Sequence, residues 1–167
     1  MKRIVLVAVM ALVCVGYAVA QPRAIGARLG WGVAFSYEHS LGNNMLSLDV
    51  DAPGFDGIGA AVTYDWINPF GTAVPWNHRG EWNWYMGVGA SGGFRWGGVV
   101  NNNAVHRSYV GAAGRIGIEY NFWVPVQLSL DWRPTLGIGM DYGANNVYFY
   151  RDGLYVGSIS LGIRYKF

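Results

Sequence analysis

The segment that most restricts the fold of this chain is 154–167, which alternates apolar and polar or small side chains with a period of two. Such alternation places successive side chains on opposite faces of a β-strand. The segment ends in Tyr-Lys-Phe, so an aromatic residue closes its apolar face. A lipid-facing apolar face, interfacial aromatic residues and a polar inner face are typical of transmembrane β-barrel strands. The apolar face is expected to carry Tyr155, Gly157, Ile159, Leu161, Ile163, Tyr165 and Phe167.

The start of the chain has the three parts of an export signal. Two basic residues precede an apolar run over 4–15, and Ala-Val-Ala then provides a cleavage site. The run is too short to span a bilayer as a helix. We therefore expect a signal peptide at 1–20 and an outer-membrane β-barrel domain at 21–167. The only cysteine, Cys14, lies in the signal within a poor lipoprotein box, which leaves lipidation as a lesser alternative.

Composition and motifs narrow the function classes. The chain has 12 Lys and Arg against 10 Asp and Glu, and Lys2 and Arg3 lie in the signal, so the mature part is near neutral and not suited to nucleic acid. The residues from Gly87 to Gly92 fit G-x-G-x-x-G but sit inside one predicted strand, where no nucleotide fold is expected. His39 and His78 lack a ligand spacing, so neither a metal nor another cofactor is expected.

Read back from its end, the chain gives eight strands. Each is close to the ~9–11 residues that a tilted strand needs to cross a bilayer. An even number puts both termini on one side, the periplasm. Pro134 cannot donate to a ladder, so we expect a local bulge there. The polar stretches 51–56, 97–107 and 141–153 are expected to be loops. The expected strands are 24–30, 33–41, 45–50, 57–67, 82–96, 109–120, 126–140 and 154–167.

Charged residues fall on the inward face of these strands with nearly balanced sign. An eight-stranded barrel is only wide enough for side chains to fill it, and buried charges must pair. We therefore expect ion pairs to close the lumen in its periplasmic half; a conduit for small solutes is the alternative. The inward charges are Arg28, Arg95, Arg115, Arg133, Arg164, Lys166, Glu38, Asp49, Asp65, Glu119 and Asp131.

Five of these charges are expected to form one connected network. Counting back from the turn at 121–125 places Glu119 near Gln127 and Arg115 near Asp131 in an antiparallel pair. Diagonal neighbours on a sheet face lie ~7–8 Å apart, within reach of long side chains. The predicted network is Arg115, Glu119, Asp131, Arg133 and Arg164.

Four segments resemble the small eight-stranded outer-membrane barrels of the kind formed by the transmembrane domain of outer membrane protein A. They are Asn-Trp-Tyr-Met-Gly-Val-Gly at 83–89, Gly-Ile-Glu-Tyr-Asn-Phe at 117–122, Leu-Ser-Leu-Asp-Trp-Arg-Pro at 128–134 and Leu-Gly-Ile-Arg-Tyr-Lys-Phe at 161–167. The resemblance implies an all-β, up-and-down, antiparallel transmembrane barrel. No periplasmic domain follows in the sequence, so it does not extend to cell-wall anchoring.

The resemblance also implies partners. The barrel would contact outer-membrane lipid and meet the barrel assembly machinery during biogenesis, and a monomer is expected. The assembly signal would be Phe167 with Tyr165 and Ile163 before it. Deleting Phe167 is expected to leave the protein unassembled.

The function expected from these features is structural, or an interaction with an envelope partner, without catalysis. The main alternative is a lipid A-modifying hydrolase, because some deacylases of this architecture use an outward His and Ser. His106 and Ser108 share the outward face, but Glu119 points inward and cannot orient the histidine. A soluble barrel with an apolar ligand inside would need apolar inward residues.

Overall fold

The computed structural model describes residues 22–71, 79–100, 103–142, 146–152 and 159–167, so the predicted signal peptide lies outside the described residues. No helix in these ranges is long and apolar enough to cross a membrane. The strands are β1 (Pro22–Gly30), β2 (Gly32–Leu41), β3 (Asn44–Pro53), β4 (Gly57–Pro69), β5 (Gly80–Val100), β6 (Asn103–Phe122), β7 (Val126–Trp132), β8 (Thr135–Asp141), β9 (Asn146–Asp152) and β10 (Ile159–Lys166).

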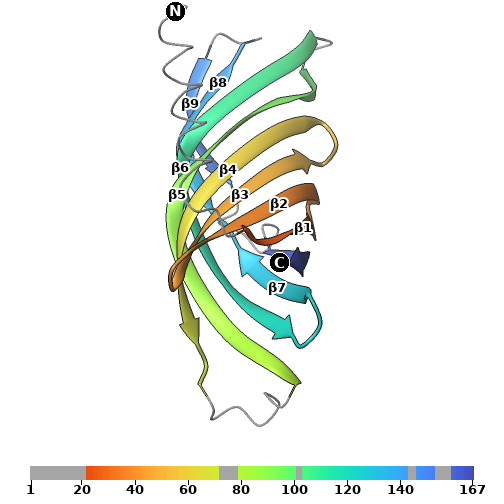
Figure 1. Ribbon diagram of the computed structural model, residues 1–167. Coiled ribbons are helices and arrows are strands. Elements are labelled where there is room, and N and C mark those ends of the chain that lie inside the picture. The colour runs from red at the N-terminus through yellow and green to blue at the C-terminus, as the bar shows by residue number, and fades with distance from the viewer. Residues whose placement is uncertain (1–21, 72–78, 101–102, 143–145, 153–158) are drawn as a thin grey trace, which may run out of the picture.

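The strands close into a ring (Figure 1). β1 to β6 pair in sequence order, β6 pairs with β7, β7 with β10, and β10 with β1, all antiparallel. β7 and β8 both pair antiparallel with β6, on successive stretches of it, so they are two segments of one strand. β10 pairs with β7 and β9 pairs with β8, so β9 and β10 are two segments of the next strand. The ten segments therefore make eight strands, and the predicted closed eight-stranded antiparallel barrel is confirmed.

The seventh strand is interrupted where the sequence predicts a bulge. β7 ends at Trp132 and β8 begins at Thr135, with Arg133 and Pro134 between them. Proline cannot donate to the ladder, but its carbonyl accepts a hydrogen bond from the Gly114 amide at 2.9 Å. The register on β6 is the same on both sides of the interruption, with Ile116 opposite Trp132 and Ala113 opposite Thr135, so the predicted bulge is wrong.

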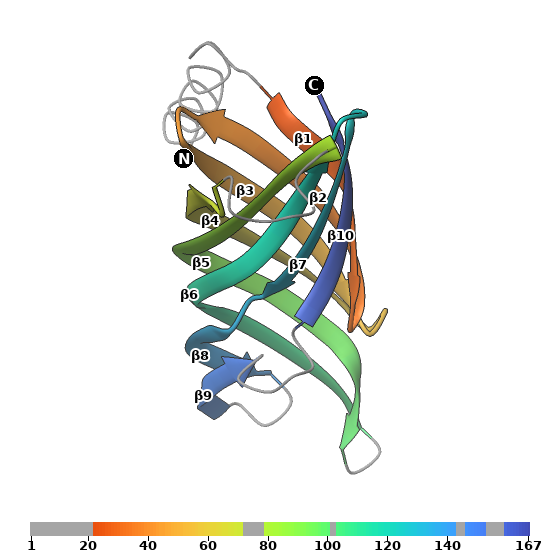
Figure 2. The ribbon, with the colours of Figure 1, turned by 90° about the horizontal axis from the view of Figure 1, so that it is seen from below.

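The two ends of the barrel differ (Figure 2). The terminal end holds the start of β1, the end of β10 and the tight turns between β2 and β3 and between β6 and β7. The far end holds the β1–β2 turn, where Gly32 has a φ of 133°, and the extended hairpins of β5 with β6 and of β8 with β9. The far end thus projects more sheet than the terminal end.

Three predicted loops are wrong in part. The β5–β6 ladder continues to Val100↔Asn103, past a register shift between Arg95 and Gly98, so most of 97–107 is strand. Ladder hydrogen bonds use the backbone, so a polar sequence does not by itself end a long hairpin. In the same way β9 occupies most of the expected loop 141–153, and β3 runs through Asp51 to Pro53. Residues 154–158 of the predicted last strand lie outside the described residues.

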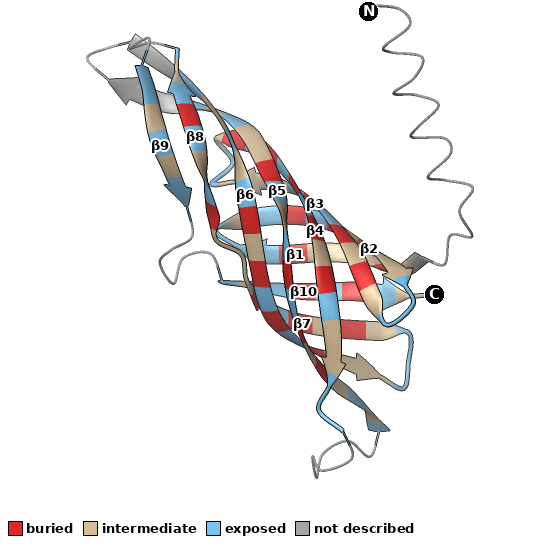
Figure 3. Ribbon diagram, turned by 90° about the vertical axis from the view of Figure 1, so that its left-hand side faces the viewer, coloured by how far each residue is buried: buried red, intermediate tan, exposed pale blue. Residues whose placement is uncertain are grey.

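Burial alternates along the strands with polar residues inside and apolar residues outside (Figure 3). On the outer face Val88, Val110 and Ile138 are 59%, 65% and 57% exposed. On the inner face Ser36, Glu38 and other polar side chains have almost no exposed surface. The predicted inward and outward sets are therefore confirmed for the described strands, and the molecule's interior is its polar part.

Candidate functional site

The candidate site is the charged lumen, which is built in three layers of side chains. At its centre lies Arg115 of β6, whose side chain is fully buried. Its guanidinium lies 3.1 Å from Asp65 of β4, 3.4 Å from Asp131 of β7 and 3.7 Å from Glu38 of β2. It also lies over the ring of Tyr85, 4.8 Å from the centroid. One arginine thus meets three carboxylates and an aromatic face from four strands.

The terminal layer surrounds Glu119. This buried carboxylate accepts hydrogen bonds from Asn83 at 3.0 Å and Gln127 at 2.6 Å, and it pairs with Arg23. Arg23 also bonds to Glu38 at 2.8 Å. Asn121 also donates to Glu119 at 2.9 Å. The layer is therefore a cluster of two carboxylates held by one arginine and three amides, and it closes the lumen near the chain termini.

The far layer surrounds Asp49 of β3. Arg28 and Arg133 each donate to its carboxylate at 2.7 Å. Arg28 also pairs with Asp131, and Arg133 bonds to Asp51 at 2.5 Å. The arrangement alternates charge across the barrel, so each carboxylate of this layer has a cation beside it.

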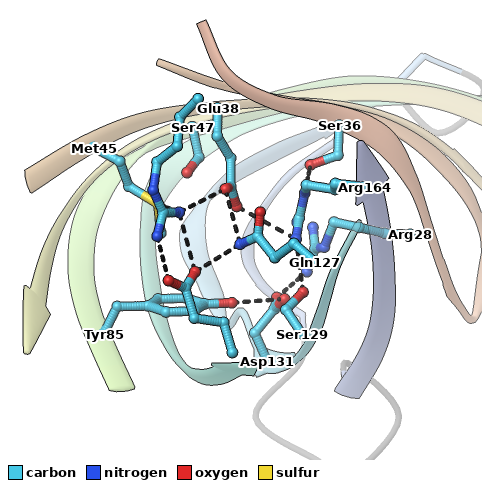
Figure 4. Close-up of polar contacts among 12 residues, drawn as sticks. Arg28, Ser36, Glu38, Met45, Ser47, Tyr85, Gln127, Ser129, Asp131 and Arg164 are labelled. Atoms are coloured by element: carbon cyan, nitrogen blue, oxygen red, sulfur yellow. Dashed lines mark hydrogen bonds and ion pairs between the residues drawn. The ribbon is translucent and has the colours of Figure 1, made fainter. Parts of the chain in front are cut away.

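Arg164 of β10 joins the layers from the closing strand (Figure 4). Its guanidinium lies 3.3 Å from Glu38 and donates to Ser36 at 2.9 Å and Ser129 at 2.7 Å. Figure 4 shows these side chains converging inside the barrel from both sides of the seam between β1 and β10. Closure of the ring and closure of the lumen therefore depend on the same strand.

The five predicted network residues all point into the lumen, but only Arg115 and Asp131 form an ion pair with each other. The others are joined through intermediates. Glu119 reaches the rest through Arg23 and Glu38, and Arg133 through Asp49 and Arg28. We call the connected set of Arg23, Arg28, Glu38, Asp49, Asp51, Asp65, Arg115, Glu119, Asp131, Arg133 and Arg164 the lumen network.

Two details of that prediction are wrong. Asn121 pairs with Gln127, and Gly117 with Asp131, so the register is shifted by two residues from the predicted one. The two predicted neighbours of this pair of strands are nevertheless in contact, Glu119 with Gln127 and Arg115 with Asp131. The shift arises because β6 runs on to Phe122, leaving only 123–125 for the turn. Arg133 also lies in the far layer rather than in the half nearest the termini, beside Asp51.

Sequence reading missed Arg23 and Asp51 as lumen residues. Arg23 stands one residue before the predicted first strand, and Asp51 one residue after the predicted third. Period-two parity assigns Asp51 to the inward face once the third strand is extended by one residue. Counted from the inward Arg28, the same parity would place Arg23 outward, and its inward position accompanies a register shift between Pro22 and Ala24 in the β1–β2 ladder.

The other singled-out residues lie outside the lumen or serve packing. His106 is exposed, and the Ser108 hydroxyl lies 3.1 Å from that of Tyr142. In β5, Gly87 and Gly89 face the β4 backbone, where an added Cβ would come within 2.5 and 1.8 Å of carbonyl oxygens. The glycine motif therefore permits close strand packing. His39 bonds to Tyr37 at 3.1 Å, and His78 lies outside the described residues.

The predicted assembly signal lies on the outer face at the terminal end. Ile163, Tyr165 and Phe167 are each more than half exposed, and the last two rings contact edge to face at 5.4 Å between centroids. The Phe167 amide donates to the Arg23 carbonyl at 3.4 Å, so the segment also completes the β1 seam. Its role in assembly remains a prediction.

Comparison of the chain with protein-family models, curated proteins and solved structures found no match.

Proposed function

We propose that the chain is an integral outer-membrane β-barrel with a closed lumen, and that its role is structural or an interaction with another component of the envelope. The termini would lie in the periplasm, and lipid would surround the strands. The resemblance to barrels of the outer membrane protein A type supports this, as does the geometry of the barrel.

The observation that carries the proposal is the reversed distribution of polarity. Large apolar side chains are exposed on every strand from β2 to β6 and on β8 and β10, whereas the buried residues are mostly polar or charged. In water such a surface is an association liability, because soluble monomers rarely expose a large contiguous apolar patch. In a bilayer the same apolar surface would contact lipid, and a closed barrel pairs all the backbone hydrogen-bonding groups of its strands.

The lumen network supports a closed barrel over a pore. Its three layers place side chains from β1, β2, β3, β4, β6, β7 and β10 across the interior. An eight-stranded barrel has room for little more than its own inward side chains. Each ion crossing the lumen would have to part these pairs.

The test is a planar-bilayer conductance measurement on protein refolded into liposomes, with folding checked by heat-modifiable migration on a gel. We expect insertion without regular conductance steps. The double variant Arg115→Ala/Asp131→Ala, which removes the central pair together, is expected to conduct more than the parent. Regular conductance steps from the parent protein would overturn the proposal of a closed lumen and show that the barrel is a pore.

The absence of catalysis needs its own test, because His106 and Ser108 do share one strand. Ser108 contacts Tyr142, and no described carboxylate bonds to His106. We expect the mass spectrum of lipid A to be the same in cells with and without the protein. Loss of one acyl chain that depends on Ser108 would establish the hydrolase alternative.

A further inference from the structure

A cavity of about 320 Å³ opens above the far layer of the lumen network. Its floor is formed by Arg28, Arg133 and Asp51, and β9 supplies Tyr150 and Asp152 to its wall. The volume is near the lower end of the about 300–1,000 Å³ typical of small-molecule sites. We call this space the mouth cavity. It lies outside the closed part of the barrel, so it can be filled without opening the network.

The wall of the mouth cavity holds a preformed aromatic element. The rings of Tyr109 and Tyr150 stack with 4.2 Å between centroids and 9° between planes. Tyr109 lies across two glycines, because a Cβ at Gly59 or Gly93 would meet its ring or hydroxyl at under 3 Å. The Tyr150 hydroxyl donates to Asp152 at 3.0 Å. These residues therefore hold an aromatic surface beside a carboxylate.

The charges around the cavity favour a neutral ligand. Arg28 and Arg133 already pair with carboxylates, and Arg95 lies 3.3 Å from Asp56. An anion would compete with these carboxylates for the arginines and would be repelled by Asp51 and Asp152. A cation would be repelled by the arginines. A neutral, hydroxyl-rich molecule can accept from guanidinium groups and donate to carboxylates at the same time.

The cavity also reaches the outer surface of the barrel. Its lining includes Val33 and Ile159, which share the outward faces of their strands and are each 41% exposed, and Trp31, which is 74% exposed. The β1–β10 ladder ends at Leu29↔Leu161, and among the described residues β9 pairs only with β8. A ligand can therefore meet an apolar flank as well as the polar floor.

We propose that the mouth cavity binds a neutral saccharide ring, with Tyr150 and Asp152 as its main contacts. The hydroxyl groups of the sugar would bond to the arginine and aspartate side chains, and its apolar face would pack on the aromatic wall. The sugar can come from a free oligosaccharide or from the headgroup of a glycolipid that enters along the apolar flank. Only this second source rests on the proposed membrane location.

The experiment uses the refolded protein in phosphatidylcholine nanodiscs, free of maltoside detergent, with maltose as the probe and calorimetry or saturation-transfer NMR as the readout. We expect maltose to bind more tightly than glucuronate or glucosamine. Tyr150→Phe and Asp152→Asn should each weaken maltose binding by about tenfold, the effect of one hydrogen bond to a charged group.

The matched control is Tyr148→Phe. Tyr148 lies two residues before Tyr150 on the inward face of β9, but it does not line the mouth cavity. Equal effects of the two tyrosine variants, tighter binding of a charged sugar, or no maltose binding by the folded parent would each overturn the proposal.

A second arm distinguishes the two sources. Nanodiscs that contain galactosyl diacylglycerol are compared with nanodiscs that contain the same molar fraction of phosphatidylglycerol. Weaker maltose binding only with the glycolipid supports the headgroup source, whereas unchanged binding supports a free saccharide.

Discussion

At the scale of single residues, the molecule depends on carboxylates shared between arginines. Asp131 is the clearest case, because Arg28, Arg115 and the Tyr85 hydroxyl all reach it. A buried ion pair is weak evidence for net stability, but removing one partner leaves an uncompensated charge. The lumen network should therefore tolerate paired substitutions better than single ones.

The first prediction is that Asp131→Ala lowers the free energy of unfolding by about 3–5 kcal/mol, since two buried guanidinium groups lose their shared partner. Urea unfolding of the protein refolded in liposomes measures this cost. A cost within about 0.5 kcal/mol, typical of surface substitutions, would mean that the lumen is well hydrated.

A double-mutant cycle locates the interaction. Asp131 and Arg115 are in contact, and we expect a coupling energy in the 0.5–3 kcal/mol range of contacting residues. Arg133 is the matched control, because it bonds to Asp49 and Asp51 instead. Equal coupling of Asp131 to both arginines would show that the ion pairs are interchangeable.

At the scale of strands, glycines on the inner face make room for the lumen network. A Cβ at Gly117 would lie 2.6 Å from the Asp131 Cβ and 2.7 Å from the Tyr85 ring. At Gly114, three residues earlier in β6, the nearest atom would be Pro134 Cγ at an ordinary 3.6 Å. The same substitution should therefore have different effects at the two positions.

We predict that Gly117→Ala destabilises the barrel by about 1–3 kcal/mol, the usual cost of overpacking. Gly114→Ala should be close to neutral, because the outward position has space. Thermal unfolding followed by circular dichroism compares the two variants directly. A loss at Gly114 equal to that at Gly117 would show that backbone freedom, and not space, decides the cost.

The closing strand carries the third prediction. Phe167→Ala should reduce the folded fraction recovered from cells, because it removes the aromatic ring that ends the apolar face of β10 and contacts the Tyr165 ring. The backbone bond from residue 167 to β1 is kept in this variant. Trp123→Ala is the control, since Trp123 is an exposed aromatic residue at the same end, in the turn between β6 and β7. The measurement is heat-modifiable migration of membrane extracts. Equal yields of both variants would remove the special role of Phe167.

The strands could be predicted from sequence because period two is fixed by the geometry of extended chains. Their lengths could not, since backbone pairing in the β5–β6 hairpin continues through polar residues, and the turn-forming residues on either side of β9 concealed its strand pattern. The network was predictable in outline from the parity of Arg115 and Asp131. The individual ion pairs of the network could not be predicted, because contacts across the lumen join strands that are distant in sequence. The pair of Arg23 with Glu119 is an example.

At the scale of the whole molecule, the distribution of polarity supports the proposed location in a bilayer. Charges are inside and paired, and the outward faces carry leucine, isoleucine, valine and aromatic side chains. The aromatic wall of the mouth cavity and β9, which within the described residues pairs with β8, belong to the far end, where the barrel projects most sheet. The closed part of the barrel would thus anchor the protein in the bilayer, and the mouth cavity would bind the ligand.

The most direct test is spin-label accessibility in liposomes at four single-cysteine positions, using residues 21–167, which contain no cysteine. Phe35→Cys and Leu161→Cys report the outward face, where both residues are 51% exposed, and Ser36→Cys and Ser129→Cys report the buried inward face. We expect high contact with lipid-dissolved oxygen at the first two positions and low contact at the other two. High accessibility of the outward positions to a water-soluble nickel reagent would contradict it.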